Sequence, residues 1–238
     1  KIIVIPQSTS KTKINFDKKK NIISFVGKLN KAKGYNIFGV SILKILDKYP
    51  DWKSVIIGNE PREKFFFKHK NLKHLGYKSN SYILNKLKEV AISVVPSQWN
   101  EPFGRSSIEA ASRGSALIIS NSGGLSETTK DAIVIESITV DNIYKKIKFL
   151  IDNKQYRKKL QRNAHKNFIL TNKYSSNLLD TLRSSLITKK ININFNENKK
   201  LKIFHITNFN ERFNGRLHYN TSKRINNGLI KLGHNVFS

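Results

Sequence analysis

Along the first 187 residues, short apolar runs alternate with segments whose apolar residues recur at helical spacing. The apolar runs predict buried strands at residues 21–26, 53–57, 72–75, 91–95, 115–120 and 133–135. Between the first two, Phe38, Ile42 and Ile45 fall on one face of a helix predicted for residues 35–49. Further helices are predicted at residues 79–90, where Ser79 is suited to the N-cap, and at 103–113. This alternation predicts an α/β fold, a Rossmann-like doubly wound parallel sheet with helices on both faces.

The pattern then becomes helical and later restarts. Three consecutive helices are predicted at residues 140–151, 154–169 and 174–186, and the polar stretch 188–200 is typical of a linker. Residues 201–238 predict a new strand, a polar loop at 208–220, a helix and the start of another strand. We therefore predict three parts: a domain at 1–187, a linker at 188–200, and at 201–238 an incomplete second domain, too short to bury its own core.

The chain is strongly basic, with 44 lysines and arginines against 16 acidic residues and a net charge of +28. Such a charge suits anionic partners, either a membrane surface or a nucleic acid. The excess is spread along the chain, and lysine, isoleucine and asparagine are abundant together, which also fits a compositional bias without a partner. No recognition helix or aromatic RNA platform is evident, so we expect peripheral contact with an anionic membrane rather than nucleic-acid binding.

Two absences narrow the chemistry. The chain has no cysteine, which excludes disulfides, thiolate metal sites and cysteine nucleophiles. No apolar run approaches the roughly 20 residues of a membrane span. We expect a cytoplasmic location, with membrane contact confined to the inner face. The chain also lacks methionine, even at position 1, so we expect a fragment of a longer product.

Candidate chemistry lies in the loops after the strands, because ligands of open α/β sheets bind at the carboxyl ends of the strands. The first such loop runs from Gly27 to Gly34 and contains Lys28, Lys31 and Lys33. Glycine allows close approach of a ligand, and the following helix start and the lysines favour phosphate. A solvated basic turn is an equally open interpretation of this loop alone.

The loop and helix after the fourth strand carry two carboxylates, Glu101 and Glu109. They flank a helix N-terminus suited to phosphate, and each carboxylate can accept hydrogen bonds from sugar hydroxyls. A helix-dipole partner for Glu101 and a solvated position for Glu109 remain open. A third loop contains Gly123 and Gly124, whose amides would suit a phosphate or a hydroxyl, or only a tight turn with a capping serine.

Taken together, these motifs resemble the C-terminal, donor-binding domain of retaining GT-B glycosyltransferases of the family-four type (glycosyl transferases group 1), over about residues 1–187. Glu101 and Glu109 have that family's spacing of two glutamates separated by seven residues. The residues that match the setting of the three motifs are Gly27, Leu29, Lys33, Gly34, Pro96, Ser97, Pro102, Phe103, Gly104, Ala110, Gly123, Gly124 and Glu127.

The resemblance implies that Lys28 and Lys33 hold the donor diphosphate as leaving group and that Glu101 hydrogen-bonds the transferred sugar. These three are the implied catalytic residues. It also implies that Glu109 binds the ribose hydroxyls. The full donor-binding set implied in this way is Gly27, Lys28, Lys33, Tyr77, Lys78, Phe103, Gly104, Arg105 and Glu109, with Tyr77 and Lys78 at the base and the backbone of residues 103–105 at the phosphates.

The implied activity is transfer of a sugar from a nucleotide diphosphate sugar to an acceptor hydroxyl, with retention, in envelope polysaccharide or glycolipid synthesis. No metal or cofactor is implied for this domain. The acceptor is unknown, because residues 1–8 resemble only the end of the family's acceptor domain, and 201–238 resemble the start of another. Lys28 also stands where the family has arginine. A catalytically idle nucleotide-binding module and, less favoured, a basic nucleic-acid-binding protein are the alternatives.

Overall fold

The computed structural model describes residues 3–186, 200–205 and 221–237. The chain divides into two compact units, Lys1–Leu186 and Ile187–Ser238, which are described separately. The predicted linker at 188–200 lies almost entirely outside the described residues, as does the predicted loop at 208–220.

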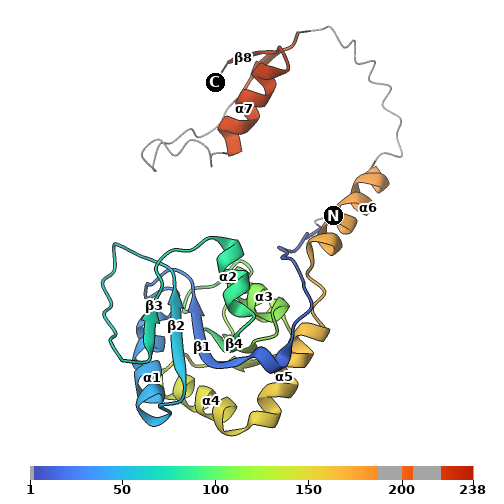
Figure 1. Cartoon of the computed structure of the whole chain (residues 1–238). Coiled ribbons are helices and arrows are strands. Elements are labelled where there is room, and N and C mark those ends of the chain that lie inside the picture. The colour runs from blue at the N-terminus through green and yellow to red at the C-terminus, as the bar shows by residue number, and fades with distance from the viewer. Residues whose placement is uncertain (1–2, 187–199, 206–220, 238) are drawn as a thin grey trace. The chain divides into compact units, whose positions relative to one another are not determined.

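The first unit is built on a six-stranded parallel sheet (Figure 1). Its strands are β1 (Lys20–Val26), β2 (Lys53–Ile57), β3 (Leu72–His74), β4 (Val90–Val95), β5 (Ala116–Ser120) and β6 (Ala132–Ile135). The strand order is β3-β2-β1-β4-β5-β6, and every neighbouring pair runs parallel. This order is that of a doubly wound Rossmann sheet, in which successive strands are added outward from β1 on one side and from β4 on the other. The predicted fold class is confirmed.

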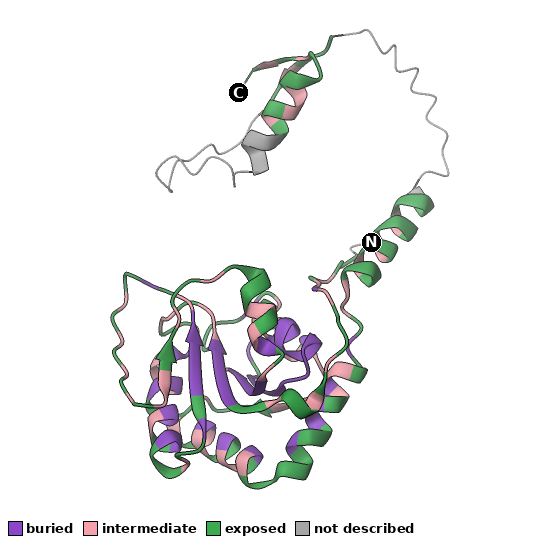
Figure 2. Ribbon diagram, viewed as in Figure 1, coloured by how far each residue is buried: buried purple, intermediate pink, exposed green. Residues whose placement is uncertain are grey.

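Helices cover both faces of the sheet. They are α1 (Tyr35–Lys48), α2 (Asn80–Leu87), α3 (Arg105–Ser112), α4 (Val140–Asp152), α5 (Lys154–Lys166) and α6 (Asn172–Leu186), with short 3-10 helices at Phe16–Lys18 and Gly124–Thr128. Ile23 and Phe25 of β1 pack against α1 and α4, whereas Ile22 belongs to the core of α2 and α3 on the other face. The strands β2, β4 and β5 and the middle of β1 are consequently buried, whereas the edge strands β3 and β6 are largely not (Figure 2).

Local sequence explains where these elements begin and end. In α1, the predicted stripe of Phe38, Ile42 and Ile45 is fully buried, and each such side chain contributes about 1.5–3 kcal/mol through burial. Ser79 caps α2 as predicted, its hydroxyl accepting a hydrogen bond from the Tyr82 amide. The main difference lies in α3, which begins at Arg105 rather than at Phe103, because Gly104 has φ +120°.

The second unit contains β7 (Lys202–Phe204), α7 (Thr221–Lys231) and β8 (Asn235–Phe237). The two strands pair in parallel, with Ile203 opposite Val236. A strand, a helix and a parallel strand form one βαβ unit, as the sequence predicted for this region. Its identity as the start of an acceptor domain stays a prediction.

Candidate functional site

A cleft opens at the carboxyl ends of β1 and β4, the two central strands at which the strand order switches. The chain leaves β1 toward α1 on one face and leaves β4 toward α3 on the other, so the two loops separate at the carboxyl edge. The cleft has a volume of about 510 Å³ and is lined by residues from the loops after β1, β3 and β4, together with the start of α3. Of the predicted site residues, all but Lys28 line it: Gly27, Lys33, Tyr77, Lys78, Glu101, Phe103, Gly104, Arg105 and Glu109.

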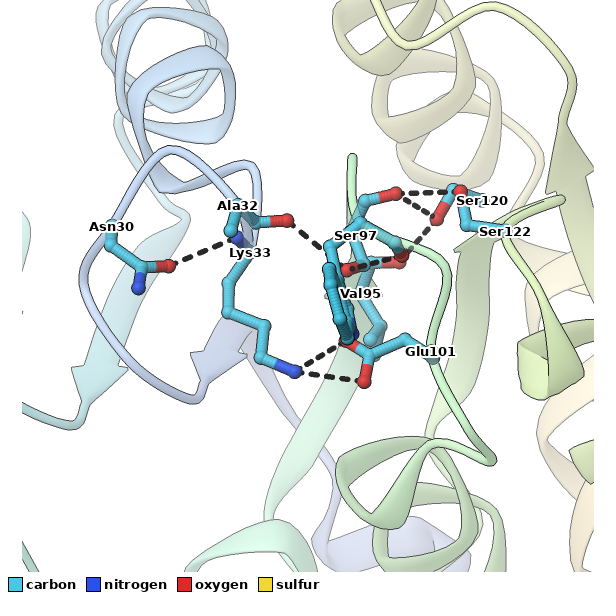
Figure 3. A network of polar contacts seen from close by, with 9 residues as sticks. Asn30, Ala32, Lys33, Val95, Ser97, Glu101, Ser120 and Ser122 are labelled. Atoms are coloured by element: carbon cyan, nitrogen blue, oxygen red, sulfur yellow. Dashed lines mark hydrogen bonds and ion pairs between the residues drawn. The ribbon is translucent and has the colours of Figure 1, made fainter.

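An ion pair spans the cleft between the two loops (Figure 3). Lys33 Nζ lies 2.6 Å from Glu101 Oε1 and 2.8 Å from Oε2, so the ammonium binds both carboxylate oxygens. The Lys33 side chain is 32% exposed, whereas that of Glu101 is 9% exposed. The Lys33 amide donates to Asn30 Oδ1, which fixes the loop that carries the lysine. The two residues predicted to serve the donor therefore bind each other in this structure.

The glycine pair after β5 supports the backbone of Glu101. Gly124 N donates to Glu101 O at 2.7 Å, and Glu101 N donates to Ser122 O at 3.3 Å. Gly123 has φ +60°, and a Cβ there would lie 2.5 Å from Glu101 O. One predicted alternative, a capping serine, is wrong: the 3-10 helix that follows is preceded by Gly123 and has no side-chain cap. The glycines thus allow the two loops to touch.

Ser97 connects three loops at the base of the cleft (Figure 3). Its carbonyl accepts hydrogen bonds from the hydroxyls of Ser120 and Ser122, each at 2.7 Å. Its own hydroxyl donates to Ala32 O at 3.2 Å. The backbones approach even more closely at Gly34, where φ is +71° and a Cβ would lie 1.9 Å from the Pro96 carbonyl oxygen. This buried network holds the Lys33 and Glu101 loops in a fixed relation.

Glu109 lies on α3 and is 4% exposed. Asn80 Nδ2 donates to its Oε1 at 2.6 Å, and Arg105 Nε donates to the same oxygen at 3.0 Å. Burial raises the pKa of Glu109, while the hydrogen bonds and charge of Arg105 and the hydrogen bond of Asn80 oppose that shift. Sequence reasoning missed Asn80. The only signal was its place directly after the capping Ser79, at the start of a helix facing the cleft.

The N-terminus of α3 faces the cleft without a side-chain cap. Its N-cap is Gly104, which makes no side-chain hydrogen bond, and Phe103 and Arg105 line the cleft on either side of it. The first amides of a helix lack intrahelical partners and carry the positive end of its dipole. This geometry suits an anionic group bound between the two glutamates.

The remaining predicted residues differ in their exposure. Tyr77 and Lys78 line the cleft; Tyr77 is 82% exposed, and Lys78 Nζ lies 5.4 Å from the centroid of the Tyr82 ring. Lys28 is exposed and is not among the lining residues. Its charge acts on Glu60 in the loop after β2, whose pKa is lowered to about 2 mainly by hydrogen bonds from Arg62. The structure therefore brings Lys33, Glu101 and Glu109 together and leaves Lys28 outside.

Neither a metal cluster nor a membrane span is evident in the described parts of the chain. Within residues 3–186, 200–205 and 221–237, no group of three histidine or acidic residues is arranged to hold a metal ion. The helices of these segments are likewise too short or too polar to cross a membrane.

Comparison with known proteins places these features in context. The family model for glycosyl transferases group 1 matches residues 6–167. The putative glycosyltransferase YtcC of Bacillus subtilis is 28% identical, and the match covers 72% of this chain and 47% of that protein. The chain spans about half the length of the curated relatives it matches.

Similar solved structures include two that illustrate the match. One is the C-terminal domain of a glycosyl transferase group 1 family protein, LpcC, from Francisella tularensis, with a TM-score of 0.55, 25% identity, and coverage of 68% of this chain and 85% of that domain. The other is Anabaena Alr3699/HepE in complex with UDP-glucose, with a TM-score of 0.58, 17% identity, and coverage of 69% of this chain and 49% of that one. The second likeness bears on the fold alone.

Proposed function

The chain belongs to the glycosyl transferases group 1 family, and from this premise we propose that residues 1–187 form the donor-binding half of a retaining glycosyltransferase. The substrate is a nucleotide diphosphate sugar, and the sugar passes to an acceptor hydroxyl. The acceptor is bound by a part of the enzyme that this unit does not supply. The UDP-glucose held by the Anabaena neighbour is the model for the donor class.

The main support for this proposal is the ion pair between Lys33 and Glu101. This pair lines the same cleft as Glu109 and the start of α3. A diphosphate offers oxygens to the Lys33 ammonium and to the α3 amides. Once Lys33 turns to the phosphate, the Glu101 oxygens become free to accept hydrogen bonds from the sugar. Glu109 keeps Oε2 for the ribose hydroxyls, because Asn80 and Arg105 both bind Oε1.

These residues lower the barrier by stabilising the leaving group. During transfer the bond between the anomeric carbon and the β-phosphate oxygen breaks, and the acceptor oxygen forms a bond to that carbon. Negative charge develops on the departing diphosphate, where the α3 amides, together with Lys33 once it has turned from Glu101, stabilise it. The acceptor proton leaves with the departing phosphate. Retention requires the acceptor to enter from the face that the diphosphate leaves.

Nucleotide titration tests the donor site. A ligand at 100 times its Kd stabilises the folded state by about 2.7 kcal/mol, so UDP or GDP should raise the melting temperature measurably. ATP at the same concentration and ionic strength controls for general polyanion binding. If neither diphosphate acts beyond ATP, the proposed donor site is wrong.

A catalytically idle nucleotide-binding module is the second candidate, because the contacts proposed for the cleft account for donor binding and do not by themselves include an acceptor. Sugar turnover separates the two. We expect the chain, joined to a complete acceptor domain, to release UDP or GDP from the matching nucleotide sugar. Tight nucleotide binding without any release would favour the idle module.

We further propose an acceptor in envelope polysaccharide or glycolipid synthesis, reached from the cytoplasmic face of an anionic membrane. The net charge of +28 supports contact with such a surface. Co-sedimentation with vesicles of phosphatidylglycerol, and not with vesicles of phosphatidylcholine, is the expected result. Equal sedimentation with both would contradict the electrostatic part of this proposal.

A further inference from the structure

The diphosphate site as predicted from sequence needs two cations, Lys28 and Lys33, but only Lys33 lines the cleft. Lys28 is exposed, and its charge acts on Glu60 in the neighbouring loop. Two other cations line the cleft: Lys78, in the loop after β3, and Arg105, the first residue of α3. If the proposed function is correct, the Arg105 side chain adds a cation at a position where the resemblance implied only a backbone contact with the phosphates.

We infer that the Arg105 side chain, rather than Lys28, supplies the second positive charge that grips the donor diphosphate. Arg105 directly follows the N-cap Gly104, so its side chain leaves the backbone where the unpartnered helix amides begin. Its side chain is 66% exposed and accessible to a ligand in the cleft. Helix amides and guanidinium would therefore act on the same phosphates.

The hydrogen-bond pattern of Arg105 leaves the required donors available. Its Nε donates to Glu109 Oε1 at 3.0 Å, and its two terminal nitrogens donate no hydrogen bond to the residues that the structure describes. A guanidinium anchored through Nε presents its terminal nitrogens as a planar fork, which matches two phosphate oxygens. The anchor also limits the rotamer freedom lost on binding.

The competing explanation is that Arg105 only completes a surface pair with Glu109, four residues along the helix. The two roles differ in what they recognise. A diphosphate contact is absent when the ligand is a nucleoside, whereas a residue that merely positions Glu109 affects nucleoside and diphosphate alike. Comparing UDP with uridine, and GDP with guanosine, therefore separates them.

The experiment measures the Kd of these four ligands by calorimetry, with ligand-observed NMR for the weaker nucleosides. Arg105→Gln should weaken diphosphate binding about ten- to hundredfold and change nucleoside binding less than about threefold. Arg105→Lys keeps the charge without the fork and should fall between. Lys28→Gln should match Lys44→Gln, an exposed lysine of α1 outside the cleft that corrects for the loss of one charge. Unchanged melting temperatures would show that the variants are folded.

Each contrary outcome has a distinct meaning. Equal loss of nucleoside and diphosphate binding in Arg105→Gln, or a diphosphate loss confined to Lys28→Gln, would overturn the role of Arg105 while the donor site stands. If the unaltered chain binds neither UDP nor GDP, the proposed function fails, and this inference fails with it.

Discussion

Lysines at the two edges of the parallel sheet have different hydrogen-bond partners. At the carboxyl edge, the Lys33 ammonium binds the Glu101 carboxylate and no other group of the described residues, in an open cleft. At the amino edge, Lys19 donates to three backbone carbonyls, those of Leu87, Val90 and Arg113, at 3.0, 2.8 and 2.7 Å. Lys19 thus ties together the ends of α2 and α3 and the start of β4.

The difference lies in what a ligand can replace. Backbone carbonyls at helix ends are fixed by the fold, and a cation there also complements the helix dipole. No anion can displace three such oxygens without opening the structure. A carboxylate on a loop can be exchanged for a phosphate, because the competing groups have the same charge. We therefore assign the amino edge to stability and the carboxyl edge to binding.

The largest expected effect is on stability at the amino edge. Lys19→Met should lower the free energy of unfolding by about 2–3 kcal/mol, because three carbonyls lose their hydrogen-bond donor. Nucleotide affinity, measured well below the melting temperature, should not change. The exposed neighbour Lys18, replaced by methionine, is the control in urea denaturation. A stable Lys19→Met protein that had lost nucleotide binding would reverse the assignment of the two edges.

The second effect is on affinity at the carboxyl edge. Lys33→Ala should weaken UDP or GDP binding about 10- to 100-fold, since charge-assisted hydrogen bonds are worth about 1.5–3 kcal/mol. The matched control is Lys31→Ala, an exposed lysine of the same loop outside the cleft lining. Calorimetry gives both affinities. Full affinity in Lys33→Ala would remove the basis of the proposed site.

Two glycines at the carboxyl edge, Gly123 and Gly76, allow the close backbone contact with Glu101 to be tested separately from backbone strain. Gly123 and Gly76 have φ of +60° and +66°, but an added Cβ would lie 2.5 Å from Glu101 O at Gly123 and would meet nothing within 4 Å at Gly76. Alanine at Gly76 should cost about 1 kcal/mol of backbone strain. Gly123→Ala should cost more and should also weaken nucleotide binding, because Glu101 must shift. Equal stability losses, measured by denaturation, would argue against the close approach.

The smallest effect concerns pH. Burial raises the pKa of Glu109, so its carboxylate becomes protonated at a pH above the usual glutamate range. Nucleotide affinity should fall as the pH drops through the raised pKa of Glu109, because a protonated carboxyl group accepts hydrogen bonds from the ribose hydroxyls less well. The sign for stability is opposite: the contribution of Glu109 is present below its ordinary pKa and is lost as pH rises through the raised value. In Glu109→Gln the corresponding part of both pH profiles should flatten.

The fold was largely predictable from local pattern, and the site only in part. Apolar runs ending at glycine or proline fixed the strands, and helical spacing fixed α1, because both depend on neighbours along the chain. The roles of Gly123 and Asn80 were not predictable, since each depends on a partner from another loop, Glu101 in one case and Glu109 in the other. The donor-site roles of Lys33, Glu101 and Glu109 stay predictions.

The sequence by itself determined the doubly wound sheet and the edge at which ligands bind, because parallel pairing and burial on both faces follow from the alternation of strands and helices. The order of the strands is seen only in the structure. Only the tertiary structure decided which lysines face the cleft. Lys28 and Lys33 lie five residues apart in one basic loop, and their spacing does not distinguish them. The turn at Gly34 and its contact with Pro96 bring Lys33 to Glu101, while Lys28 remains on the outside. A long side chain is directed by the backbone that packs around its loop, and that packing forms only when the fold is complete.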